Sequence, residues 1–172
     1  MNLGGKNYEF AVDTLRLLHI VGAFAWVGLS ATVSFYVAPA AVAAGESGFR
    51  FMKSLFAQPV FAMSFAIVSG ITTLAGILLY LVGNASSHFT QTGNMVLGIG
   101  AVAGLAASVH GGAVLGRTTK TIAETLAKLG TTLSAADMTQ LNDLTIKMVT
   151  QSRHSLILMV IALVCMGSAR YL

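Results

Sequence analysis

Four long apolar runs constrain this chain more than any other feature of its sequence. They cover residues 12–38, 60–82, 95–115 and 154–171. A helix needs about 20 consecutive apolar residues to cross a bilayer. Charged residues make up only 9% of the chain, against roughly a quarter in soluble domains. We therefore expect an all-α integral membrane protein, a four-helix bundle that forms a single transmembrane domain over residues 1–172.

The basic residues are distributed unevenly between the two sides that four spans define. Residues 40–59 and 117–153 lie on one side, and both termini and the 83–93 turn lie on the other. The first side carries seven of the ten basic residues, namely Arg50, Lys53, Arg117, Lys120, Lys128, Lys147 and Arg153. The positive-inside rule then predicts a cytoplasmic 117–153 connection and both termini outside. We expect the inner membrane of a bacterium or archaeon.

The net charge of +4 is explained by this topology and by contact with the lipid bilayer. Aromatic residues do not alternate with the basic ones, so we expect no nucleic-acid partner.

Two polar segments carry an amphipathic pattern. Ser134 precedes a stretch whose apolar residues, from Met138 to Val149, form one broad helical face. This stretch predicts an additional cytoplasmic amphipathic helix that continues into the fourth span. A shorter segment, Phe49 to Phe56, is expected at the membrane interface, before Pro59 starts the second span.

A row of small residues at intervals of four marks the third run. It consists of Gly100, Gly104, Ser108, Gly112 and Gly116. Such a row lets a second backbone approach closely, so leucine at Gly104 or Gly112 is expected to disrupt helix packing. The alternative is close approach of a flat cofactor or a partner subunit. We expect a homo-oligomer or a subunit of a larger membrane complex.

Histidine inside an apolar run is a candidate functional residue, because an imidazole in hydrocarbon must be neutral and partnered. His110 in the third run lies about 160° round the helix from Ser108, at 100° per residue. One face of this helix is therefore expected to pack and the other to present an imidazole. The alternative is a hydrogen-bonded packing residue.

The first run places three candidate residues on one helix face. Trp26 follows His19 by seven residues, about 20° further round the helix, and Arg16 precedes His19 by about one turn. Arg16 and Arg170, which ends the fourth run, are candidates to hold the propionates of a haem. The alternative is that both arginines reach the lipid headgroups and Trp26 only packs.

These histidines allow three ligand sets for a metal. Neutral imidazole binds haem iron or copper, and helix bundles build such sites between facing helices. One set is a bridging pair of His19 and His110, which differ in depth by about 10 Å, at about 1.5 Å per residue, unless helix tilt reduces the offset. Two other sets fit the depth of the residues better. An outer site would combine His19 with Met95 or Met166. An inner site would pair His110 with His154, which opens the fourth span.

The stretch His19…Gly22…Trp26…Gly28 resembles the first helix of small membrane proteins related to the copper resistance D domain and to the HemJ type of protoporphyrinogen oxidase. The closing residues 166–171 are similar to the end of uncharacterised bundles of this kind. The resemblance implies a haem or metal site near His19, and oxidoreductase or copper-transfer work for the bundle.

Three classes of function remain open from the sequence. The first, which we expect, is a b-type haem protein that transfers electrons within the membrane, to or from a quinone, alone or as the anchor subunit of a redox complex. The second is copper handling or metal transport with the same histidines and soft methionine ligands. The third is a structural accessory subunit.

Overall fold

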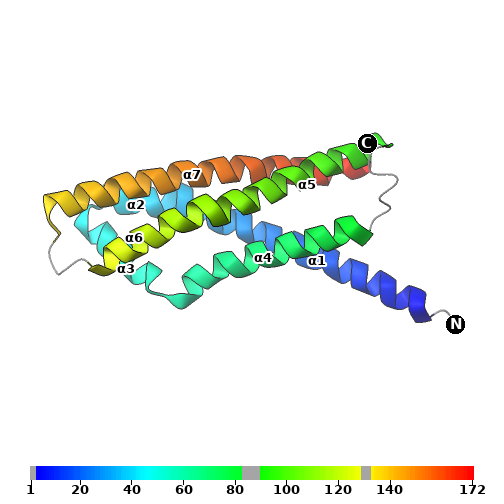
Figure 1. Cartoon of the computed structure of the whole chain (residues 1–172), viewed down its shortest axis with the longest axis horizontal. Helices are drawn as coiled ribbons and strands as arrows, with labels where there is room; N and C mark the ends of the chain where they lie inside the picture. The colour runs from blue at the N-terminus through cyan, green and yellow to red at the C-terminus, as the bar shows by residue number, and fades with distance from the viewer. Residues whose placement is uncertain (1–2, 83–89, 129–132) are drawn as a thin grey trace.

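A computed structural model describes residues 3–82, 90–128 and 133–172, and within these ranges the chain is helical with no strand (Figure 1). Four helices are long and apolar enough to cross a membrane: Gly5–Ala43, Pro59–Val82, Thr92–Lys128 and Ala135–Tyr171. The all-helical class and the four candidate spans agree with the sequence prediction. The first and last described turns lie toward the same end of the bundle, which we call the termini end.

The first helical stretch bends back on itself at the opposite end, which we call the connection end. Helix α1 (Leu3–Thr32) continues through one π-helical turn, η1 (Val33–Val37), into α2 (Ala38–Ala43). The chain then reverses at Gly45, whose φ of 60° lies in the region that favours glycine. Helix α3 (Glu46–Phe56) follows.

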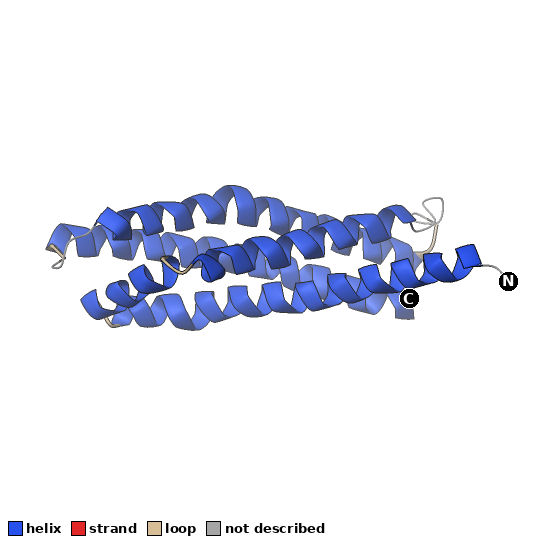
Figure 2. Ribbon diagram, turned by 90° about the horizontal axis from the view of Figure 1, so that it is seen from below, coloured by secondary structure: helices blue, strands red, loops and turns tan. Residues whose placement is uncertain are grey.

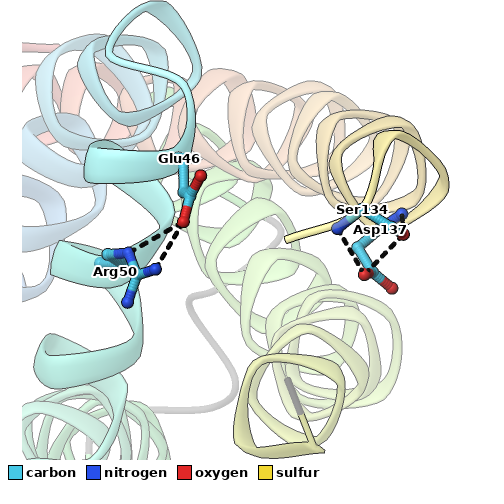
Figure 3. Close-up of polar contacts among 4 residues, drawn as sticks. All are labelled: Glu46, Arg50, Ser134 and Asp137. Carbon is cyan, nitrogen blue, oxygen red and sulfur yellow. Dashed lines mark hydrogen bonds and ion pairs between the residues drawn. The ribbon is translucent and has the colours of Figure 1, made fainter. Parts of the chain in front are cut away.

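Helix α3 packs tightly inside the protein. A Cβ atom at Gly48 would overlap the backbone of Ala41, so only glycine allows α2 and α3 to approach this closely. Phe49 and Met52 are buried, while Arg50 and Glu46 form an ion pair on the outer side (Figure 3). The apolar face of this helix packs against Ile122, Leu126 and Leu141 within the protein, and its predicted position at the membrane interface stays a prediction.

The second and third long helices follow. Helix α4 (Pro59–Val82) begins at the predicted proline. Helix α5 (Thr92–His110) passes through a second π-helical turn, η3 (Gly111–Leu115), into α6 (Gly116–Lys128). This third helical stretch therefore continues well beyond the apolar run, into residues that were expected to form a polar connection.

The last helix, α7 (Ala135–Ser168), begins at a capping box and ends in a short 3₁₀ turn, η4 (Ala169–Tyr171). The Asp137 backbone N–H donates to Ser134 Oγ at 3.1 Å, and the Ser134 backbone N–H donates to Asp137 Oδ2 at 2.9 Å (Figure 3). Hydrogen bonds from the Ser134 side chain and backbone lower the pKa of the Asp137 carboxyl. The helix thus begins after Ser134 and continues into the fourth apolar run, as predicted.

The long helices pack as two pairs, α1 with α4 and α5 with α7. All four run lengthwise through the molecule, and α1 and α4 cross each other in the view of Figure 1 (Figures 1 and 2). At the connection end, α2, α3 and α6 fill the space between the pairs. The buried core there consists of Ala38, Ala41, Phe49, Met52, Ile122, Leu126, Leu141 and Met148. Toward the termini end the pairs separate, and this separation leaves room for the cavity described below.

The row of small residues packs only over its first half. A Cβ atom at Gly100 would lie 2.8 Å from Met166 Cγ and 3.2 Å from the Ala162 carbonyl oxygen, so α5 and α7 are in close contact there. A Cβ atom at Gly104 would make ordinary contact, and one at Gly112 would meet no described atom within 4 Å. Gly112 lies in the π-helical turn η3, which has no buried residues, so among the described residues the packing role predicted for Gly112 is wrong.

Candidate functional site

A cavity of about 1120 Å³ lies between the two helix pairs at the termini end. It is larger than most small-molecule sites, which measure roughly 300–1,000 Å³. Most of its lining is apolar or small. Its charged and imidazole side chains are Glu9, Asp13, Arg16, His19 and Arg170.

One face of α1 contributes the central wall of this cavity. Arg16, His19 and Trp26 all line it, as their spacing along the helix predicted. Trp26 is only 8% exposed and packs with Ala107 and Leu156. The indole therefore separates the cavity from the interior of the bundle, whereas Arg16 lies two helical turns or more toward the termini end.

His19 is held in one orientation by the backbone of α4. Its Nδ1 lies 2.8 Å from the Thr72 carbonyl oxygen. A carbonyl oxygen can only accept a hydrogen bond, so Nδ1 carries the proton, and in the neutral ring Nε2 then carries the lone pair. Within the described part of the chain no hydrogen bond engages Nε2. In its neutral form, His19 therefore carries a lone pair on Nε2 that no described residue engages.

Two glycines make this contact between α1 and α4 possible. A Cβ atom at Gly76 would lie 2.7 Å from His19 Cε1 and 2.9 Å from Nδ1, so any side chain there would push the ring away from Thr72. A Cβ atom at Gly22 would lie 2.5 Å from Thr72 Oγ1. The sequence alone did not point to Thr72 or Gly76. The only feature of the sequence at Gly76 is a glycine within an apolar run. Glycine is common in membrane helices, so its presence does not indicate a contact with a histidine.

Arg16 and Arg170 come from opposite helix pairs and line the same cavity. Arg16 Nη1 lies 3.0 Å from Asp13 Oδ1, but both side chains are mostly exposed, at 64% and 71%, so this ion pair is weak. Arg170 lies over the Tyr171 ring at 5.2 Å. The two guanidinium groups are suited to binding carboxylates on a ligand that enters from the termini end.

The methionines differ in their relation to the cavity. Met166 lines it and packs closely against Gly100, whereas Met95 is 44% exposed and does not line it. Of the two thioethers that the sequence suggested as partners for His19, the structure brings only Met166 to the same cavity.

His110 lies in a different environment from His19. Its Nδ1 is 2.7 Å from Ser155 Oγ and its Nε2 is 2.9 Å from Gln151 Oε1, both on α7. Both ring nitrogens are thus engaged in hydrogen bonds, and His110 does not line the cavity. His154 is exposed and does not line it either. In the described ranges, no three His, Cys, Asp or Glu side chains gather in a metal-binding arrangement.

Comparison of the chain with protein-family models, with curated proteins and with solved structures finds no match.

Proposed function

We propose that this protein is an integral membrane protein that binds b-type haem in the cavity between its helix pairs and takes part in electron transfer, and that His19 Nε2 would bind the haem iron. The observation that carries this proposal is the hydrogen bond from His19 Nδ1 to the Thr72 carbonyl. A ligating histidine in proteins almost always donates its other ring N–H to a carbonyl or carboxylate, which fixes the tautomer and raises the basicity of the ligating nitrogen.

The rest of the cavity supports a haem as the ligand. Arg16 and Arg170 provide guanidinium donors for two propionates at the termini end. Apolar side chains such as Leu97, Val102 and Leu105 line the wall on α5 and exclude water. Met166, which lines the same cavity, would supply a thioether as a second ligand to the iron. Haem bound there would supply one-electron exchange, and a membrane-soluble quinone is the electron partner that we propose.

The absorption spectrum of the purified protein tests this proposal. Protein purified in detergent from cells supplied with haem and copper is expected to show the Soret band of haem, and sharpened α and β bands after dithionite. Colourless protein that carries copper would refute the haem proposal in favour of copper handling. Colourless, metal-free protein would refute both and leave the structural accessory subunit.

We propose that the connection end faces the cytoplasm and that both termini lie outside. The support is the distribution of charge, because seven of the ten basic residues belong to the segments 40–59 and 117–153. In this orientation α3, α6 and the first turns of α7 form an additional helical layer on the cytoplasmic side. The haem cavity then opens toward the outer leaflet.

Reporter fusions test the orientation. Alkaline phosphatase fused after Leu172 is expected to be active, since this enzyme folds only outside the cytoplasm, and a green fluorescent protein fused there is expected to stay dark. The matched control places both reporters after Lys128, where the opposite result is expected. An inactive phosphatase and a bright fluorescent signal after Leu172 would reverse the assignment.

A further inference from the structure

We infer that the cavity opens sideways toward the lipid through a window between α4 and α5, and that a quinone with a prenyl chain binds there. The head group of the quinone lies in the cavity and its chain lies in the window. The inference deepens the proposed function and rests on it for the membrane insertion of the four helices. It does not rest on bound haem, because the residues that form the window are not the proposed ligands of the iron.

Two contacts between α4 and α5 frame the window. At one end, Thr73 Oγ1 donates to Ser108 Oγ at 3.1 Å. At the other end, the Tyr80 hydroxyl oxygen lies 3.8 Å from the position that a Cβ atom at Gly98 would take. Tyr80 follows Thr73 by seven residues, so the two contacts are about 10 Å apart along α4, at about 1.5 Å per residue. Between these contacts, both helices line the cavity.

The residues between the two contacts border the cavity and the outer surface at once. Ile77 on α4 and Val102 and Leu105 on α5 line the cavity, and all three are exposed. Ile77 lies about 40° further round α4 than Thr73, on the side away from Thr72, at 100° per residue. Because Thr72 is the residue that contacts α1, Ile77 lies at the outer rim of the opening. The cavity is therefore continuous with the outer surface between α4 and α5.

The window carries no charge. The charged and imidazole side chains of the cavity come from α1 and from η4, whereas residues 59–82 and 92–116 contain no Asp, Glu, Lys or Arg. Ile77 lies five residues before the end of α4 at Val82, a depth of about 7.5 Å. A phospholipid head group that entered here would lose its hydration without gaining a charged partner. The window therefore favours a ligand with a neutral head group.

A prenyl quinone matches both parts of this space. Its apolar chain fits between the side chains of Ile77, Val102 and Leu105. The carbonyl oxygens of a quinone accept hydrogen bonds, and Thr73 and Tyr80, which line the cavity at the two ends of the window, carry donor hydroxyl groups. Ligand sites typically combine such apolar walls with a few polar groups. The window thus provides the proposed electron partner with a binding place and with an entrance from the bilayer.

The fluorescence of Trp26 tests the inference, because Trp26 is the single tryptophan of the chain and lines the cavity. The emission is measured in nanodiscs with the His19→Ala variant, which keeps every residue of the window and is expected to be free of haem, itself a quencher. Titration with decylubiquinone, a quinone with an alkyl chain, is expected to quench the emission saturably.

Phenylalanine at both rims of the window is expected to weaken binding. In the same background, Ile77→Phe with Val102→Phe should raise the decylubiquinone concentration for half-maximal quenching several-fold. The matched control is Leu74→Phe with Val109→Phe, because neither residue lines the cavity and Val109 is as exposed as Val102, at 69% and 68%. This control should match the background, and the quinone partitions equally into all of these nanodiscs. Thermal unfolding verifies the fold, and Val102→Phe alone is used if the double variant unfolds.

Equal quenching curves for the window variant and its control would overturn the inference, and so would quenching that does not saturate. Equally strong quenching by a brominated phospholipid, lost in the window variant, would make the window a site for lipid chains and reject the quinone. The haem proposal fails separately. Wild-type protein without a Soret band, together with saturable quenching that depends on the window, would reject haem and retain the quinone site. A Soret band together with equal curves would reject the quinone site alone.

Discussion

Replacing His19 with alanine is expected to abolish haem binding, so that the purified variant has lost the Soret band while its thermal unfolding stays close to that of wild type. The reason is that His19 is the imidazole in the cavity whose ring is oriented by a backbone carbonyl, at 2.8 Å from the Thr72 oxygen. The measurement is the ratio of Soret absorbance to protein concentration, with the haem content confirmed by extraction.

The controls for His19→Ala are the other two candidate ligands. His110→Ala and His154→Ala are expected to retain haem, because neither residue lines the cavity. Gly76→Ala displaces the His19 ring without removing it, and is expected to weaken haem affinity by about 10-fold to 100-fold, the usual effect of losing the partner of a ligating histidine. Haem that persists in His19→Ala but disappears in His110→Ala would reject the proposed ligand.

Replacing Gly100 with leucine is expected to lower the free energy of unfolding by about 3 kcal/mol, the upper part of the range for overpacked sites. A Cβ atom at this position would already press on Met166 Cγ at 2.8 Å and on the backbone oxygen of Ala162 at 3.2 Å. The side chain can move, but the helix backbone cannot without separating α5 from α7. Thermal unfolding of the purified variant in detergent measures the effect.

Gly112→Leu is the matched control for this packing prediction. It lies on the same helical stretch and has no described atom within 4 Å of its Cβ position, so the same substitution is expected to change stability by less than about 0.5 kcal/mol. Equal destabilisation by both substitutions would mean that the cost comes from general crowding and not from the contact of α5 with α7.

The sequence by itself determined the features that depend on neighbouring residues. The apolar length of each run predicts four candidate spans, and the Ser134 cap and Pro59 predict where helices begin. The spacing of Arg16, His19 and Trp26 places them on one helix face, and the structure shows all three lining one cavity. Each of these features follows from the length, the caps or the periodicity of a single helix.

Only the tertiary structure decided which residues each side chain contacts. The partner of His19 is a backbone carbonyl of α4, which no side-chain pattern can reveal, and it is accessible because Gly76 lies opposite the ring. The partners of His110 come from α7. The π-helical turn η3 breaks the row of small residues before Gly112. These outcomes depend on which helices pair and how they are rotated, and both are set by packing between segments far apart in the chain.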